Sequence, residues 1–345
     1  MVAGCGYDTI HQIDMGYQVS VLVPVYNVEA YIETCVRSLM EQTYPNIQFV
    51  FVDDCSTDNS LQILNRVVAE YPDRAQDVLV VSHPQNKGLA AARNTAIDHA
   101  TGSFISHVDS DDYMERDAIE NLVSRQVETG ADIVSGQALA EYEDHDSVME
   151  LREYASMHDM TLDMIKPTLR HTLWGRLIRK SLYTDHALSA KEGANIGEDA
   201  QVMPCLAYYA TKAVNCHCLV YHYNCKKENS YSHKIGDLHR LCQRGIQDVE
   251  SYQVVREFFR DKDAAFFNEA ERSLSKFVQL LMGYYVLSTN KQEFDKLKQL
   301  YQQLKCGRVK VRTWHEIHAA TSYNFWYCKL TSFVFKPVKS KWRRR

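Results

Sequence analysis

The sequence predicts an α/β protein in which helices flank an open, mostly parallel sheet, followed by a helical C-terminal region. Short β-branched runs alternate with helical patterns between Val19 and Ser135, as expected for a sheet covered on both faces. Acidic clusters directly follow two of these runs, at Asp53 and at Asp109. Ligands of open α/β sheets bind beyond the carboxyl ends of the strands, so we expect the functional site there.

The expected strands and helices alternate in a regular order. Val19–Val25 is a nearly continuous apolar run, typical of a parallel strand buried on both faces. Apolar residues at helical spacing then predict a helix over Val28–Leu39. By the same criteria, further strands are expected at Ile47–Val52, Val78–Ser82, Phe104–Val108 and Ala131–Ser135, and further helices at Ile63–Val68, Gly88–Ala100 and Ile119–Val127.

The alternation of strand and helix patterns is weaker after residue 136. Glu141–Glu153 is charged and irregular, so we expect an exposed connection there. Mixed elements are expected at Thr168–Tyr183, Ile196–Ala210 and Ala213–Tyr223. His239–Leu304 is charged with a helical period, which predicts a helical region.

Composition restricts the function classes. A net charge of −5 gives no general case for nucleic-acid binding. The ten cysteines lack paired CxxC spacing, which favours free thiols in a reducing compartment, and we expect a cytoplasmic protein. The close cluster Cys216-His217-Cys218 lies in an expected strand, so buried thiols are favoured over a metal site. Because no run of about twenty apolar residues occurs, we expect no membrane span.

Three carboxylates crowd the end of one expected strand, at Asp109, Asp111 and Asp112. Like charges this close raise each other's pKa unless something neutralises them. A divalent cation would do so, since Mg²⁺ and Mn²⁺ prefer oxygen ligands. An acidic turn that caps the next helix is the alternative, and the cluster alone favours neither.

A second acidic pair, Asp53 and Asp54, ends the preceding expected strand. Ser56 or Asp58 is enough to cap the following helix, so the pair exceeds what a cap needs. Carboxylates in this position can accept hydrogen bonds from a base or from ribose hydroxyls.

A glycine followed by small residues begins the next helical pattern. Gly88 lets the helix start close to a ligand, and Lys87 and Arg93 offer positive charge to phosphate oxygens. An alanine-rich packing helix is the alternative. Neither GxGxxG nor GxxxxGK[ST] occurs, which argues against a standard dinucleotide fold and against a P-loop NTPase.

Four of these segments together resemble the family 2 glycosyltransferases, which have the GT-A fold. The resemblance rests on VSVLVPVYNVEAYI, FVDDCSTDNS, NKGLAAARNTAI and HVDSDDYM in this order, over about Val19 to Ser135. It extends less firmly to about Ser232 through LWGRLIRKSLY, IGEDAQV and VYHYNCKKENSYS.

The resemblance implies a role for each matching residue. The nucleotide, most often uridine, and its diphosphate would contact the donor-binding residues Pro24, Tyr26, Asp53, Asp54, Lys87, Arg93, Asp109 and Ser110. Asp109 and Asp111 would form the DxD motif that holds Mn²⁺ or Mg²⁺. Glu198 and Asp199 would be the catalytic pair, and we assign the base to Asp199. Adjacent helical residues point about 100° apart, so only one of the two can face the reacting hydroxyl directly. Two acidic residues that merely favour a helix N-terminus are the alternative.

The acceptor side departs from the family pattern. Many relatives read tryptophan-asparagine-lysine where this chain has Trp174-Gly175-Arg176, so Trp174 and Arg176 are expected near an acceptor whose identity differs. The resemblance divides the chain into a nucleotide-sugar half (18–136) and an acceptor half (160–233) of one domain (18–233). Residues 1–17 would be a disordered extension and residues 234–320 a helical region.

Residues 321–345 form a basic, aromatic tail without acidic residues. Each Lys or Arg near an anionic membrane surface contributes about 1 kcal/mol, so we expect peripheral attachment at the inner face of the cell membrane. A nucleic-acid patch and a solvated tail are the alternatives.

The sequence therefore favours a metal-dependent, inverting glycosyltransferase. It would transfer a sugar from a nucleotide diphosphate donor, most often a UDP-sugar, to a hydroxyl of a glycan or lipid-linked acceptor in polysaccharide biosynthesis. A nucleotide-sugar binding protein without turnover is one alternative. A nucleotidyltransferase is another, although it would normally have a glycine-rich phosphate loop near the N-terminus, and Val23–Ala30 has none.

Overall fold

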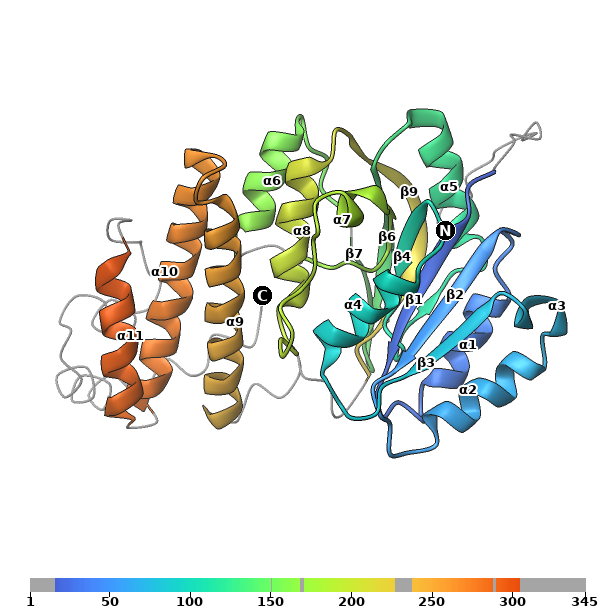
Figure 1. Ribbon diagram of the computed structural model, residues 1–345, viewed down its shortest axis with the longest axis horizontal. Coiled ribbons are helices and arrows are strands. Elements are labelled where there is room, and N and C mark those ends of the chain that lie inside the picture. The colour runs from blue at the N-terminus through green and yellow to red at the C-terminus, as the bar shows by residue number, and fades with distance from the viewer. Residues whose placement is uncertain (1–15, 150, 168–170, 227–237, 288–289, 305–345) are drawn as a thin grey trace. The chain divides into compact units, whose positions relative to one another are not determined.

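The computed structural model describes residues 16–149, 151–167, 171–226, 238–287 and 290–304 (Figure 1). The chain divides into a first unit, residues 1–164 and 170–228, and a second unit, residues 165–169 and 229–345. The expected extension at 1–17 lies outside the described residues except for Gly16 and Tyr17, and the basic tail at 321–345 lies wholly outside them.

The first unit is built on a sheet that, within the described residues, has nine strands. Its strands are β1 (Val19–Val25), β2 (Ile47–Asp53), β3 (Val78–Ser82), β4 (Phe104–His107), β5 (Tyr113–Met114), β6 (Ile133–Glu141), β7 (Asp146–Met149), β8 (Arg176–Arg179) and β9 (Ala213–Asn224). They follow the order β3-β2-β1-β4-β8-β6-β9-β5, with β7 beside β6. This arrangement confirms the predicted α/β class, and every strand predicted before residue 136 is present.

The parallel part of the sheet aligns the ends of its strands. β1 pairs in parallel with both β2 and β4, and β2 with β3. The register sets Val25 beside Asp53, so the segments that follow β1 and β2 leave the sheet at the same edge. Beyond β4 the sheet is mixed, because β8 runs antiparallel to β4 and β6 while β9 runs parallel to β6.

Helices cover both faces of the sheet (Figure 1). They are α1 (Ile32–Met40), α2 (Ser60–Ala69), α3 (Pro72–Ala75), α4 (Leu89–His99), α5 (Ala118–Thr129), α6 (Met157–Ile165), α7 (Ser181–Thr184) and α8 (Glu198–Tyr209). Successive side chains of a strand point to opposite faces. Val21 and Val23 of β1 therefore join the core with α1, α2 and α5, whereas Leu22 joins the core with α4, α6 and α8.

Two boundaries differ from the sequence-based prediction. α1 begins at Ile32 because residues 28–31 form a turn, in which the Val28 carbonyl accepts hydrogen bonds from the N–H groups of Tyr31 and Ile32. The exposed connection predicted over Glu141–Glu153 contains a strand that the sequence did not predict, because Asp146–Met149 forms β7 against the end of β6. An edge strand can be polar and irregular in sequence, because only one side of its backbone is paired.

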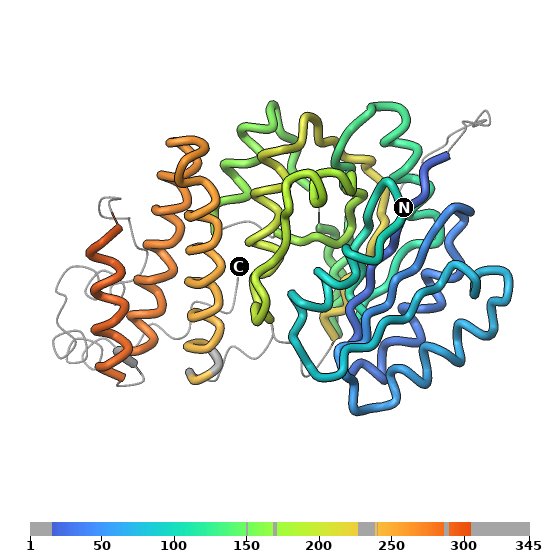
Figure 2. Tube along the Cα trace, in the orientation of Figure 1, coloured from blue at the N-terminus to red at the C-terminus, as the bar shows by residue number. Residues whose placement is uncertain are grey.

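The second unit is helical, as predicted for His239–Leu304. Its helices α9 (Leu238–Phe259), α10 (Ala264–Leu287) and α11 (Lys291–Gln303) follow one another along the trace in Figure 2. α9 and α10 pack closely, since a Cβ added at Gly245 would lie 2.9 Å from Leu281 Cδ1. The buried carboxylate of Glu271 on α10 accepts a 2.7 Å hydrogen bond from Arg256 on α9.

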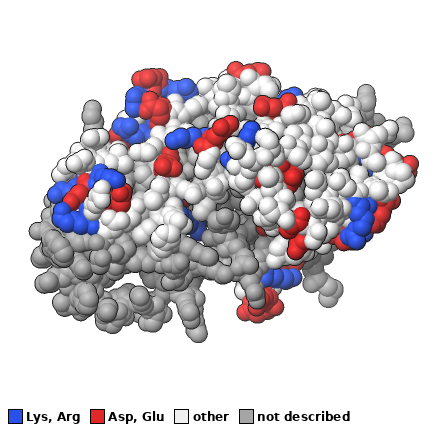
Figure 3. Space-filling model, turned by 60° about the horizontal axis from the view of Figure 1, so that its bottom comes forward, with Lys and Arg blue, Asp and Glu red and all other residues white. Residues whose placement is uncertain are grey.

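Surface charge and helix hydropathy give two further observations. Acidic and basic side chains of the described residues lie interspersed on the face shown in Figure 3, without one sign prevailing. Among the helices that the structure describes, none is both long enough and apolar enough to cross a bilayer.

Candidate active site

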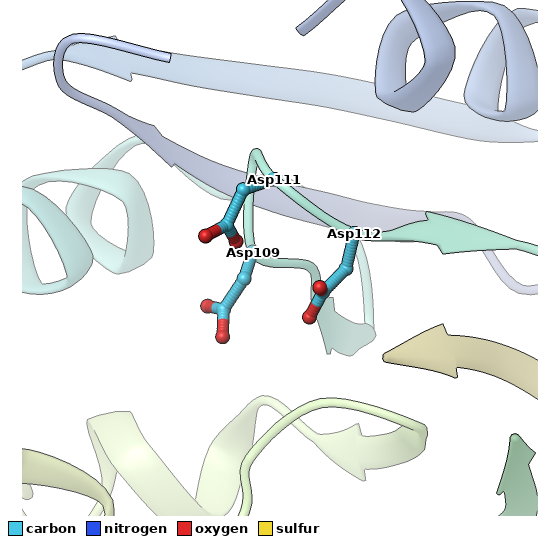
Figure 4. A group of neighbouring side chains, drawn as sticks. All are labelled: Asp109, Asp111 and Asp112. Carbon is cyan, nitrogen blue, oxygen red and sulfur yellow. The ribbon is translucent and has the colours of Figure 1, made fainter. Parts of the chain in front are cut away.

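The acidic loop, residues 109–112, follows β4 directly. Its backbone closes as a turn, in which Asp112 N–H donates to the Asp109 carbonyl across 3.0 Å. One carboxylate oxygen from each of Asp109, Asp111 and Asp112 lies within 4.8 Å of the others (Figure 4). Oxygen donors at this spacing fit a hard divalent cation such as Mg²⁺ or Mn²⁺.

Asp112 differs from the other two carboxylates because strand β9 binds it. Its Oδ2 accepts a 2.9 Å hydrogen bond from the Tyr221 hydroxyl, and its Oδ1 accepts a 3.0 Å bond from the Asn224 backbone N–H. Asp112 is 1% exposed, whereas Asp109 and Asp111 are only partly buried. Burial, together with the negative charge of Asp112, raises the pKa of Tyr221 well above its ordinary value, so the hydroxyl keeps its proton and donates.

Arg93 on α4 joins the acidic loop to the predicted catalytic pair. Its Nη2 donates to Asp109 Oδ1 across 2.7 Å, and its Nε donates to Glu198 Oε1 across 3.4 Å. The same Nη2 lies 3.8 Å from Asp199 Oδ1. Arg93 is 3% exposed, so these ion pairs form in a poorly screened environment. Residues from α4, from the end of β4 and from the start of α8 therefore meet around one guanidinium group.

The two acids that begin α8 differ in their hydrogen bonding. Glu198 accepts from Arg93, whereas Asp199 Oδ2 accepts a 3.2 Å bond from the Leu173 N–H. Asp199 Oδ1 is buried and has no hydrogen-bond partner among the described residues. An oxygen that is buried with no donor in place is unusual, and this oxygen can accept a proton.

Burial controls the titration of this pair. Burial and the like charge of Glu198 raise the pKa of Asp199 well above its ordinary value, although Arg93 opposes the shift. Burial likewise raises the pKa of Glu198, again against the effect of Arg93. Burial lowers the pKa of Arg93. The negative charges of Asp109, Asp199 and Glu198 outweigh this effect, so the pKa of Arg93 is raised.

Comparison with protein families identifies this region. Residues 20–184 match the family model described as glycosyl transferase family 2. The chain carries a glycosyltransferase family 2 domain. The match includes Arg93 and the acidic loop but ends before Glu198 and Asp199.

One curated relative of the family 2 domain is the chondroitin synthase of Pasteurella multocida. The two are 40% identical over 111 residues, which cover 32% of this chain and 11% of that protein. The chain spans about half or less of the length of the curated relatives that it matches.

Solved structures confirm the GT-A fold. S. aureus TarS in complex with UDP-GlcNAc is similar with a TM-score of 0.55 and 19% identity, over 86% of this chain and 94% of that one. The mannosyltransferase PcManGT from Pyrobaculum calidifontis, in complex with GDP-Man and Mn²⁺, is similar with a TM-score of 0.53 and 17% identity, over 93% of this chain and 88% of that one.

In the family 2 domain, Asp54 binds the backbone of the following loop. Its Oδ1 accepts from Lys87 N–H across 2.8 Å, and its Oδ2 accepts from Gly88 N–H across 2.7 Å. His83 Nδ1 lies 2.7 Å from Oδ1 of the same carboxylate, which is 3% exposed. Asp54 therefore positions the entrance to α4, a role that the sequence did not predict for it.

The other predicted donor-side residues lie along the same edge of the sheet. Asp53 ends β2 and accepts a hydrogen bond from Ser56 N–H across 3.0 Å. Pro24 is buried within β1, and Tyr26, just after β1, is 46% exposed. The Lys87 side chain is exposed, and Ser110 is buried within the acidic loop.

On the predicted acceptor side, Trp174 and Arg176 are both buried. Trp174 stacks on Tyr221 with ring centroids 4.5 Å apart and on Tyr223 at 5.5 Å. Arg176 donates from Nη1 to the Ser135 hydroxyl and from Nε to a backbone carbonyl. Burial lowers the pKa of Arg176. Part of its guanidinium group is therefore hydrogen-bonded within the protein.

Sequence reasoning did not single out several residues around the site. Tyr221 lies within the quoted VYHYN segment, but strand alternation cannot show that its hydroxyl reaches the acidic loop. His107 lies at the end of β4, with Nε2 3.1 Å from the Tyr183 hydroxyl, and burial lowers its pKa well below the ordinary value. His222 contacts Glu115 and Glu141, as expected for a strand histidine with its polar atoms satisfied.

The sequence favoured buried thiols over a metal site at the Cys216-His217-Cys218 cluster of β9. Cys216 and Cys218 are partly buried cysteines of the strand, and the thiol of each contacts the other residue's backbone carbonyl. Of the residues that the structure describes, only Asp109, Asp111 and Asp112 form a group that could hold a metal ion.

Proposed function

We propose that this chain is a metal-dependent, inverting glycosyltransferase that transfers a sugar from a nucleotide diphosphate donor to a hydroxyl of a glycan or lipid-linked acceptor in polysaccharide biosynthesis. The observation that carries this proposal is the contact of Arg93 with both Asp109 and the Glu198–Asp199 pair. Through these contacts, the Arg93 side chain lies between the candidate metal and diphosphate site and the candidate base. The chondroitin synthase relative supports a glycan product.

Asp109 and Asp111 are the carboxylates that we expect to hold Mn²⁺ or Mg²⁺. Asp112 is already bound by two donors from β9, and Figure 4 shows it set to one side of the other two. The ion would supply positive charge to the diphosphate leaving group. The presence of Mn²⁺ in PcManGT supports this choice of metal.

The donor would lie along the edge formed by the ends of β1, β2 and β4. Tyr26 and Asp53 follow or end neighbouring strands there, so they can contact the base and ribose. Arg93 Nη1 is buried and has no hydrogen-bond partner among the described residues, which leaves one donor for a phosphate oxygen. The complex of TarS with UDP-GlcNAc supports a UDP-sugar as the donor.

Asp199 would accept the proton of the acceptor hydroxyl. As that oxygen attacks the anomeric carbon, the bond to the nucleoside diphosphate breaks, and the proton passes to Asp199 Oδ1. This oxygen has no hydrogen bond to give up, and burial raises the carboxyl pKa, which strengthens it as a base. A single displacement of this kind inverts the anomeric carbon.

The decisive experiment measures UDP or GDP release from a panel of nucleotide sugars, with Mn²⁺ and after chelation. We expect one sugar to be turned over, with at least a 100-fold loss in Asp199→Asn. Asp98→Asn, on the exposed face of α4, is the matched control and should keep full activity. Tight donor binding without any turnover would favour a binding protein. Pyrophosphate release from a nucleoside triphosphate would favour a nucleotidyltransferase.

Attachment to an anionic membrane remains a proposal based on the sequence of residues 321–345. The basic and aromatic side chains of this tail would bring a lipid-linked acceptor close to the enzyme. Flotation with phosphatidylglycerol vesicles should recover the full chain but not a chain that ends before Thr321. Equal recovery of both would contradict this part of the proposal.

A further inference from the structure

Strand β9 holds the acidic loop through two residues three positions apart. The Tyr221 hydroxyl accepts a 3.0 Å hydrogen bond from the Asp109 backbone N–H and donates a 2.9 Å bond to Asp112 Oδ2. Asn224 N–H donates to Asp112 Oδ1 across 3.0 Å. Tyr221 thus contacts both ends of the four-residue turn that carries the two candidate metal ligands.

The position of the Tyr221 hydroxyl is itself tightly determined. Tyr221 is 0% exposed, and its ring stacks on Trp174 with an angle of 7° between the ring planes. Its backbone is paired with Met114 of β5, the strand that leaves the acidic loop. The ring stack and the strand pairing therefore restrict the position of the hydroxyl, and its hydrogen bonds restrict the turn.

We propose that Tyr221 is a positioning residue that sets the affinity of Asp109 and Asp111 for the divalent cation, through Asp112. The inference rests on the metal dependence proposed above and deepens it. Asp112 acts as the anchor of the loop rather than as a metal ligand.

The physical basis is preorganisation. Asp109 and Asp111 repel each other when both are ionised, so a loose loop would let their carboxylates move apart. The hydrogen bonds from β9 keep the turn closed before the cation binds. Binding therefore carries a smaller free-energy cost for ordering the acidic loop. The Trp174 stack links this effect to the acceptor half of the domain.

The test compares Tyr221→Phe with the wild type in Mn²⁺ titrations followed by electron paramagnetic resonance, without donor. Phenylalanine keeps the ring that stacks on Trp174 and removes only the hydroxyl. We expect Mn²⁺ affinity to fall about tenfold, the order expected for losing a hydrogen bond to a charged group. In transfer assays the Mn²⁺ concentration for half-maximal rate should rise equally, while the rate at saturating Mn²⁺ stays within about twofold.

Tyr113→Phe is the matched control. Tyr113 adjoins the same loop, but its hydroxyl donates to Glu141 rather than to a residue of the loop. This variant should bind Mn²⁺ as the wild type does. If Tyr221→Phe unfolds at a lower temperature but binds Mn²⁺ with unchanged affinity, Tyr221 has only a structural role and the inference is wrong.

A second variant tests the route through Asp112. If Asp112 is the anchor, Asp112→Asn should weaken Mn²⁺ binding to a similar degree, and the double variant should lose little more than either single one. Additive losses would instead assign Asp112 to the metal and overturn the inference. If the wild type itself binds no Mn²⁺, the failure lies with the proposed metal dependence, and this outcome is distinct from the others.

Discussion

Arg93 Nη2 donates a 2.7 Å hydrogen bond to Asp109 Oδ1 and so ties helix α4 to the acidic loop. Because the same guanidinium also lies 3.4 Å from Glu198 Oε1 and 3.8 Å from Asp199 Oδ1, three carboxylates share one buried cation. The charge balance of the site can therefore be tested at a single position.

Replacing Arg93 should destabilise the protein strongly at neutral pH. Arg93→Met leaves the buried carboxylates uncompensated, and we expect the free energy of unfolding to fall by about 3–5 kcal/mol at pH 8. The loss should shrink as the pH is lowered to 5, because burial raises the pKa of both Glu198 and Asp199 and so favours their protonated forms. Urea denaturation at both pH values measures this. Arg37→Met, which breaks ion pairs on the surface, is the control and should change stability little.

The raised pKa of Asp199 predicts that this proposed base reduces the stability of the fold. A carboxyl group whose pKa is higher in the folded state binds its proton more tightly there, so its effect on stability worsens as the pH rises above about 4. Without metal or donor, Asp199→Asn should therefore melt at a higher temperature than the wild type at pH 8. The difference should diminish towards pH 4. A variant that melts below the wild type at pH 8 would show that the charged form is stabilised in the fold.

Asp54 should stabilise the fold because its carboxylate accepts hydrogen bonds from two backbone N–H groups. Asp54→Ala leaves the N–H groups of Lys87 and Gly88 without their acceptor, and we expect a loss of about 3 kcal/mol in the free energy of unfolding. Chemical denaturation measures the loss. Asp73→Ala, at an exposed position on α3, should leave stability nearly unchanged. Equal stability of the two variants would contradict the structural role of Asp54.

A side chain at Gly88 should destabilise the fold. Its φ of 90° and ψ of 165° lie in a region that is essentially restricted to glycine, and an added Cβ would lie 2.3 Å from Asn195 Oδ1. Gly88→Ala should cost about 2–3 kcal/mol.

Gly130→Ala is the control, at a second glycine with a positive φ. Its φ of 68° is also positive, but an added Cβ would meet no atom within 4 Å. It should therefore cost only about 1 kcal/mol. Thermal melting of both variants measures the difference, and equal losses would contradict the extra cost expected from the Gly88 conformation together with its contact to Asn195.

Periodic patterns predicted the strands and helices of residues 19–135 well, because hydrophobic alternation is a local property. They failed at Asp146–Met149, where an exposed edge strand has no buried face to leave a pattern. The sequence also placed the acidic motifs correctly at the ends of β2 and β4.

The sequence by itself determined the fold class, the family resemblance and the identity of the candidate acids. Only the tertiary structure decided which atoms meet: Arg93 reaches Glu198, 105 positions later, and Tyr221 reaches Asp112 across 109 positions. The same holds for Asp54, whose carboxylate turns to the backbone of a later loop. The reason is physical, since local periodicity places a residue on a strand or helix, whereas strand order and register determine its distant partners.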